Sequence, residues 1–158
     1  MLSVVVSEFG GNWEASRMAR LGGKFAGIAQ VTFSGSEPAG FRAALGELAE
    51  RGLAVSVAEA SGPADVDISA PRMLDLELVG NDHPGILREI SRVLSARGIN
   101  VEELGTTCES APMAGGELFR MRALLAVPSA FDISALEDEL EALSGELMVE
   151  VSLADGDA

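Results

Sequence analysis

The chain has 158 residues, 47% of them hydrophobic, and a formal net charge of −14 at pH 7. Its length and apolar fraction allow one or two small domains. Its negative charge argues against a phosphate-neutralising surface for nucleic acid. It has no apolar run long enough to span a bilayer and does not start with a secretory leader. The single cysteine, Cys108, excludes an internal disulfide and a cysteine-rich metal site, and we expect a cytoplasmic protein.

After a short apolar segment, the first half of the chain predicts a β-hairpin. Its strands cover residues 13–20 and 25–33. The pair Gly22-Gly23 between them supplies the backbone freedom that a tight turn needs. We therefore expect two antiparallel strands here.

A helix and a final strand are expected after this hairpin. Residues 39–51 place three large apolar side chains on one helical face, and Gly52 ends the helix. The three side chains are those of Phe41, Leu45 and Leu48. Residues 53–58 then alternate like a half-buried strand, with Val55 and Val57 inward.

A linker is expected between the two halves, and a strand, a turn and a helix open the second half. Residues 61–71 combine proline, glycine and small polar residues, as linkers do. Residues 74–79 alternate apolar and acidic side chains, which predicts a strand. Residues 86–97 have apolar side chains at helical spacing. Residues 80–85 are the turn between them.

This turn has the composition of a helix start. Asp82 is expected to cap the helix, Pro84 suits its first turn, and Gly85 lets the backbone approach a neighbour closely. Free N–H groups at a helix start can hold a carboxylate. The same residues are also ordinary signals for the end of a strand and the start of a helix. The turn by itself therefore leaves two interpretations open, a small-anion site and a turn that binds nothing.

The rest of the second half predicts a hairpin, a helix and a last strand. The hairpin strands cover residues 101–108 and 118–127, with a glycine- and proline-containing turn at residues 111–116. A helix is expected over residues 132–143 and a strand over residues 147–153.

The chain repeats itself at a constant offset of 88 residues, since residues 10–14 (GGNWE) correspond to residues 98–102 (GINVE). The second half predicts strand, helix, strand, strand, helix, strand. This is the α+β, ferredoxin-like βαββαβ arrangement, an antiparallel sheet with two helices on one face. The first half predicts the same order without its opening strand and the turn that follows.

Three explanations for the missing strand are open. Residues 2–6 could form it, since valine favours strands. A partner chain could fill the gap in the sheet. Alternatively, the chain could continue upstream; the repeat aligns residues 2–9 with the end of a helix, which favours this explanation.

Residues 78–86 (LVGNDHPGI) and 98–104 (GINVEEL) resemble an ACT domain, a small ligand-binding regulatory module with the βαββαβ fold. Residues 11–21 (GNWEASRMARL), 25–28 (FAGI) and 110–113 (SAPM) resemble the glycine cleavage system transcriptional repressor family. The resemblance covers almost the whole chain, apart from the linker and the C-terminal tail.

The resemblance implies two ferredoxin-like ACT domains in tandem. They cover residues 1–60, the incomplete copy, and residues 72–153, with the linker at residues 61–71 and an acidic tail at residues 154–158. It implies a regulatory protein that senses glycine or another small amino acid. Such a protein would control transcription through a partner, a LysR-type regulator, and would form homo-oligomers through its ACT sheets. No catalysis, cofactor, metal, or direct contact with nucleic acid or membrane is implied.

By the same resemblance, the ligand-binding residues are Asn81, Asp82, His83, Gly85 and Asn100. Backbone N–H groups near Gly85 would hold the ligand carboxylate, and Asp82 would meet its ammonium group. Asn100 can both donate and accept hydrogen bonds. A role without a ligand stays open for two of these residues. His83 could be an exposed turn residue, and Asn100 could simply turn the chain.

Two other functions are open. ACT folds also serve as interaction modules without a ligand, pairing edge to edge, and as regulatory parts of metabolic enzymes. Catalysis by this chain is disfavoured, because its sequence has no phosphate loop, metal-ligand spacing or nucleophile–base pair.

Overall fold

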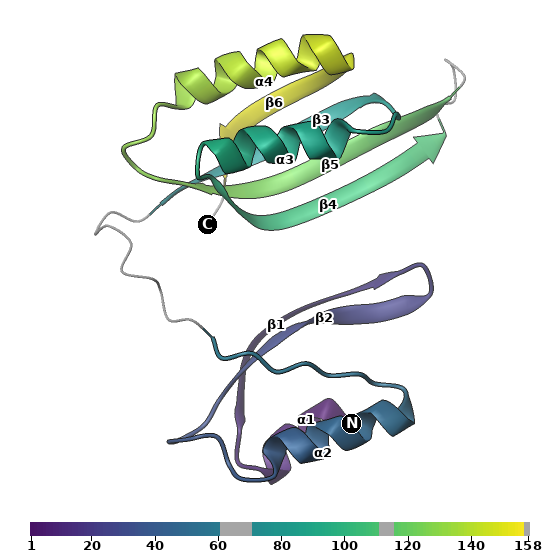
Figure 1. Cartoon of the computed structure of the whole chain (residues 1–158), viewed down its shortest axis with the longest axis vertical. Coiled ribbons are helices and arrows are strands. Elements are labelled where there is room, and N and C mark those ends of the chain that lie inside the picture. Colours follow the sequence, from purple (N-terminus) through teal and green to yellow (C-terminus); the bar gives the residue numbers. More distant parts are fainter. Residues whose placement is uncertain (61–70, 111–115, 157–158) are drawn as a thin grey trace. The chain divides into compact units, whose positions relative to one another are not determined.

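The structure is a computed structural model that describes residues 1–60, 71–110 and 116–156. It divides into two compact units, Met1–Asp65 and Val66–Ala158 (Figure 1). The predicted linker at residues 61–71, apart from Pro71, and the predicted turn at residues 111–116, apart from Gly116, lie outside the described residues.

The first unit contains a hairpin and short helices. Its elements are α1 (Leu2–Glu8), β1 (Asn12–Leu21), β2 (Lys24–Thr32), α2 (Phe41–Glu47) and the 3₁₀ turn η1 (Leu48–Arg51).

The hairpin forms as predicted, and residues 2–6 are helical. β1 and β2 pair antiparallel, with Leu21 opposite Lys24. Gly22 and Gly23 between them have φ angles of 55° and 77°, a region that glycine enters without steric cost. α1 begins at Leu2, so the N-terminal segment does not supply the missing strand.

The core of the first unit consists of the predicted helical face and one residue of α1. Phe41, Leu45 and Leu48 are buried together with Val6. The ring of Phe41 makes an edge-to-face contact with the ring of Phe33, their centroids 5.0 Å apart, so helix and hairpin are held by aromatic packing.

The prediction of a strand over residues 53–58 is wrong. Leu53, Val55 and Val57 do pack against the core, as the alternation indicates. However, the structure assigns neither helix nor strand to this segment. A strand needs a hydrogen-bonded neighbour, and the first unit has no counterpart of the strand that would lie beside it among its described residues.

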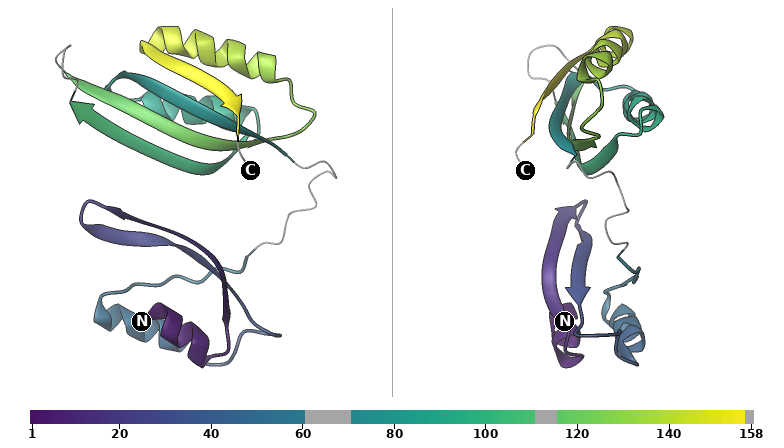
Figure 2. Two further views of the ribbon diagram at one scale, coloured as in Figure 1. Left: turned by 180° about the vertical axis from the view of Figure 1, so that it is seen from behind. Right: turned by 90° about the vertical axis from the view of Figure 1, so that its left-hand side faces the viewer.

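The second unit is a complete βαββαβ fold. Its elements are β3 (Arg72–Asn81), α3 (Ile86–Ala96), β4 (Asn100–Ser110), β5 (Glu117–Val127), α4 (Ile133–Leu147) and β6 (Val149–Asp155). The strands form an antiparallel sheet in the order β4-β5-β3-β6. Figure 2 shows both helices on one face of this sheet, which confirms the predicted ferredoxin-like arrangement.

The alternation in β3 decides which face of the sheet is buried. Leu74, Leu76 and Leu78 are at most 2% exposed and pack beneath α3 and α4. The other face is open to solvent, where Glu77 of β3 pairs with Arg122 of β5 at 2.8 Å. β6 continues to Asp155, so the first two residues of the predicted acidic tail belong to the sheet.

Candidate functional site

The turn between β3 and α3 exposes an uncapped helix start. The residue at the N-cap position of α3 is Gly85, and no side chain donates to or accepts from the backbone there. The prediction that Asp82 caps the helix is therefore wrong. Asp82 stands three residues before the N-cap, too early to reach the N–H groups of the first turn. Its own backbone N–H donates to the carbonyl oxygen of Glu117 at 2.8 Å, which ties it to β5 instead.

The exposed polar side chains of this turn are available for a ligand. Asn81 and Asp82 are both exposed. Within the described part of the chain, neither side chain makes a hydrogen bond or an ion pair. An amide and a carboxylate thus stand unused beside a helix start that also has no side-chain partner.

The two glycines of this turn have different tasks. Gly85 adopts a φ of 107°, which L-residues rarely enter, but a Cβ on it would find its nearest neighbour at 3.7 Å. It is at Gly80 that the backbone lies very close to a neighbouring residue, because a Cβ there would lie 2.5 Å from Cγ1 and 2.8 Å from Cα of Val149. The close approach predicted at Gly85 is therefore a feature of Gly80, where β3 meets the start of β6.

His83 is partly buried, and its ring nitrogens contact two backbone carbonyl oxygens. Its Nε2 lies 2.9 Å from the carbonyl oxygen of Leu147, and its Nδ1 lies 3.4 Å from the carbonyl oxygen of Pro84. Since a carbonyl only accepts, Nε2 carries the proton in the contact with Leu147. His83 thereby joins the turn to the end of α4, and the interpretation as an exposed turn residue is not what the structure shows.

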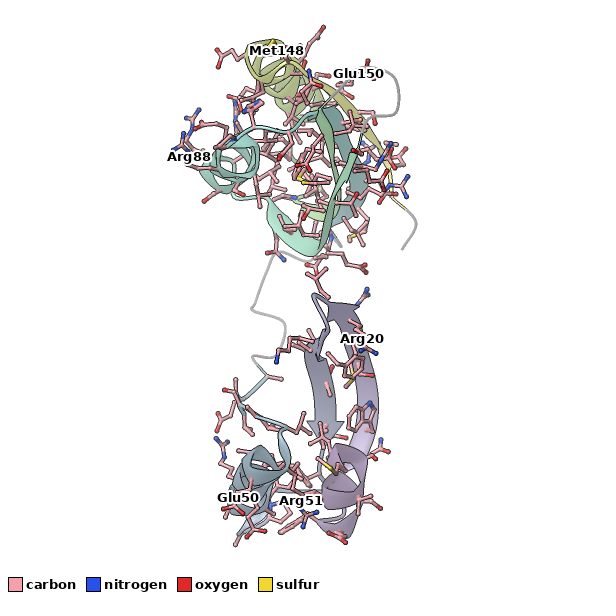
Figure 3. The ribbon with its side chains drawn as sticks, turned by 90° about the vertical axis from the view of Figure 1, so that its right-hand side faces the viewer. Arg20, Glu50, Arg51, Arg88, Met148 and Glu150 are labelled. Carbon is pink, nitrogen blue, oxygen red and sulfur yellow. The ribbon has the colours of Figure 1, made fainter. Side chains whose placement is uncertain are left out.

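Arg88 is a basic residue near this turn that the sequence analysis did not single out. It belongs to the first turn of α3, and its Nη2 is the atom nearest to a Cβ built on Gly85. The side chain is 80% exposed and pairs with Glu89 at 2.9 Å; it projects away from α3 in Figure 3. Its place three residues after Gly85 could have indicated it, because residues three apart share a helix face.

Asn100 lies at the opposite end of the sheet from the turn. Asn100 is opposite Ala126, which in turn is opposite Met73, near the beginning of β3. Asn81 stands eight residues further along β3, roughly 26 Å at the usual rise of a strand. The reason is topological, since a βαβ crossover returns the chain to the end of the sheet from which it started. The structure thus brings Asn81, Asp82, His83 and Gly85 together but does not bring Asn100 to them.

The start of β4 repeats a local structure found at the start of β1. Asn100 Nδ2 donates to Glu102 Oε1 at 2.6 Å, and Asn12 Nδ2 donates to Glu14 Oε1 at 2.6 Å. Each glutamate sits where the pairing register shifts, as in a β-bulge. In the first unit the hydroxyl of Thr32 also donates to Glu14. The hydrogen bond from Thr32, and to a smaller extent the one from Asn12, lowers the pKa of the Glu14 carboxyl. The sequence repeat therefore encodes a repeated bulge held by its own side chains.

The described residues offer no evident reactive group. Partial desolvation, followed by the negative charges of Asp82 and Glu117, raises the pKa of the exposed Cys108 thiol, which disfavours the nucleophilic thiolate. No group of three or more metal-binding side chains occurs in the part of the chain that the structure describes. Likewise, none of its described helices has the length and apolar composition needed to cross a membrane.

Matches with solved structures include two that cover nearly the whole chain. A protein of unknown function from Galdieria sulphuraria is 30% identical, with a TM-score of 0.80 over 99% of this chain and 88% of its own. A "putative glycine cleavage system transcriptional repressor" is 19% identical, with a TM-score of 0.71 over the same shares.

A third match covers half of the chain. An ACT domain protein from Streptococcus pneumoniae is 24% identical over 54% of this chain and 90% of its own, with a TM-score of 0.47. No protein-family model and no curated protein matches the chain.

Proposed function

The chain belongs to one family with the Galdieria sulphuraria protein and shares the fold of the "putative glycine cleavage system transcriptional repressor". From this premise we propose that it is an ACT-domain regulatory protein that senses a small amino acid. The effector class is glycine or another amino acid with a small side chain. The regulated process is transcription of the glycine cleavage type, reached through a LysR-type partner protein. The shared fold of the glycine cleavage repressor-like protein supports this assignment.

One observation carries the sensing proposal: an uncapped helix start lies next to an unpaired carboxylate. An amino acid has an α-carboxylate and an α-ammonium group, and it needs an anion site beside a cation site. The first N–H groups of α3, after Gly85, supply the anion site, with Arg88 nearby to reinforce it. The carboxylate of Asp82 supplies the cation site, and the amide of Asn81 can bond to either group.

His83 and Asn100 take different parts in this proposal. His83 positions the turn, because its imidazole is already committed to the carbonyl oxygen of Leu147. The Nδ2 of Asn100 is committed to Glu102, which leaves its Oδ1 as an acceptor. Because Asn100 lies at the far end of its own sheet, it would meet an effector only at a turn of another ACT domain, such as one in a second copy of the chain.

Thermal unfolding of the full chain against a panel of the small amino acids tests the proposal. A ligand that binds the native state raises the melting temperature saturably. We expect this for one small amino acid, and we expect Asp82→Ala to abolish it. Asp138→Ala on α4 is the matched control, since Asp138 is also exposed and its loss changes the charge equally. A flat response to the whole panel, or an equal response of the Asp82→Ala variant, would contradict the proposal.

A flat response would instead favour the interaction module. The edge strand β4 is long and exposed along its whole length, and such an edge can pair with that of another copy. Light scattering of the purified chain would show the oligomer, and a pull-down with a LysR-type regulator as prey would test the transcriptional partner.

A further inference from the structure

A groove runs along the second unit between α4 and the edge strand β6. The residues that line it include Glu137, Leu140, Glu141, Ser144, Val151 and Leu153. We call this surface the α4–β6 groove. It is separate from the turn at residues 81–85, and the inference drawn from it does not depend on amino-acid sensing.

One face of α4 forms the acidic wall of the groove. Glu137, Glu141 and Ser144 follow one another at spacings of four and three residues, so they project from the same side of the helix. Leu140 between them is 2% exposed and reaches down to the core. The wall therefore has carboxylates along its top and an apolar base.

The strand β6 forms the other side. It pairs with β3 on one edge only, and within the described residues no strand pairs with its other edge. Val151 and Leu153 face the helices and are only partly buried. The groove thus combines a row of unpaired backbone groups with a partly exposed apolar floor, the two features that allow an extended peptide to be added to a sheet.

The charge of α4 indicates which kind of peptide segment would bind in the α4–β6 groove. α4 carries five acidic residues and no basic residue. Arg97, directly after α3, pairs with Glu139 of α4. The side-chain carboxylates of Glu137 and Glu141, in contrast, make no ion pair or hydrogen bond with any described residue. No Lys or Arg among the described residues is paired with either carboxylate of the groove.

We propose that the α4–β6 groove binds an extended, basic segment of a partner protein, which pairs with β6 as an additional strand. Side chains of an added strand alternate between its two faces. Lys or Arg at every second position would lay its aliphatic stem over Val151 and Leu153 and bring its charged head to Glu137 and Glu141. A second copy of this chain fits poorly, because pairing through its own β6 would bring the carboxylates of its α4 close to those of the first copy, and like charges repel.

Binding of a labelled synthetic peptide to the full chain tests this proposal. The probe has eight residues in which Lys alternates with Thr, a residue that favours strands. We expect saturable binding by fluorescence anisotropy. In the double variant Glu137→Gln/Glu141→Gln the Kd should rise about five- to tenfold, as for the loss of two exposed ion pairs. The control Asp138→Asn/Glu146→Gln makes the same change in charge on α4 outside the groove and should change the Kd less than about twofold.

Two further measurements separate strand addition from simple charge attraction. The same peptide with alternate backbone amides N-methylated keeps its charge but cannot pair with β6, and we expect it not to bind. Amide chemical shifts should move at Val151 and Leu153 of β6 and not at Thr106 of β4. The proposal is overturned by an absence of saturable binding or by equal weakening in both double variants. It is equally overturned by binding of the methylated peptide or by shifts confined to β4.

Discussion

The imidazole of His83 donates from Nε2 to the carbonyl oxygen of Leu147, 2.9 Å away and 64 residues later in the chain. Leu147 is the last residue of α4, where helix carbonyl groups have no partner within the helix. The hydrogen bond therefore serves two purposes, because it satisfies an end carbonyl of α4 and holds the turn that precedes α3.

Replacing His83 should cost stability without disrupting the fold. We expect His83→Ala to lower the free energy of unfolding by about 1–2 kcal/mol, since it leaves a partly buried carbonyl without its donor. His83→Gln retains a side-chain donor and should lose less. Urea unfolding measures both changes, and a His83→Ala variant as stable as the parent would show that the hydrogen bond contributes nothing.

Gly80 should be intolerant of any side chain. In Gly80→Ala the new Cβ would lie 2.5 Å from Cγ1 of Val149 and 2.8 Å from its Cα, so the two strands must move apart. We expect a loss of about 1–3 kcal/mol, as for other overpacked sites.

Gly105→Ala is the matched control for this prediction. Gly105 is also in a strand, but a Cβ there has no neighbour within 4 Å. The control should leave the urea midpoint unchanged or raise it slightly. Equal midpoints for the two variants would contradict the close contact between β3 and β6.

Replacing Met148 with glycine should stabilise the folded protein. It ends α4 with a φ of 51°, the one residue other than glycine with a positive φ in the described chain. Its side chain is 75% exposed, so little packing is lost on removal. We expect Met148→Gly to raise the free energy of unfolding by about 1 kcal/mol, because the left-handed region disfavours L-residues by about that amount.

A glycine substitution inside the same helix should instead destabilise the folded protein. Ala142→Gly, at an exposed position of α4, should lower the free energy of unfolding by about 1 kcal/mol through helix propensity. Thermal unfolding of the two variants should therefore shift in opposite directions, and a loss of stability in both would show that Met148 makes contacts that outweigh its backbone strain.

Local sequence patterns correctly predicted the features that depend only on residues close together in the chain, such as the buried face of a strand or the position of a turn. The alternation of Leu74, Leu76 and Leu78 is sufficient to identify the buried face of β3, and Gly22-Gly23 is sufficient to locate a turn. Residues 53–58 are different. Their alternation correctly indicates which side chains face inward, but a strand also requires a partner, and sequence spacing carries no information on whether one is present.

The candidate site was predicted only in part, for a related reason. The residues around Gly85 are consecutive, so a motif in the sequence is also a cluster in space. Asn100 is near them in the sequence, but the crossover through α3 carries it to the other end of the sheet. Asp82 has the right chemistry for a cap, yet capping depends on the exact residue at which the helix begins, and that is the least predictable part of a helix.

Acid should weaken the contact between α3 and α4. Arg97 donates from Nε to Glu139 Oε2 at 3.1 Å, and its Nη2 contacts Oε1. This hydrogen-bonded pair lowers the pKa of the Glu139 carboxyl. A carboxyl group with a lowered pKa stabilises the folded state fully above its ordinary value, about pH 4.3. That stabilisation is then lost as the pH falls through the lowered value, because the folded state must take up a proton that disrupts the pair.

Glu139→Gln isolates this effect. The variant should be less stable than the parent near pH 7, and the difference should shrink steadily as the pH falls below about 4.3. Glu137→Gln removes an equivalent charge from α4 without any partner among the described residues, so its effect on the urea midpoint should be small at both pH values. A difference between Glu139→Gln and the parent that stays constant from pH 7 to pH 3 would mean that the ion pair with Arg97 is not the source of the acid dependence.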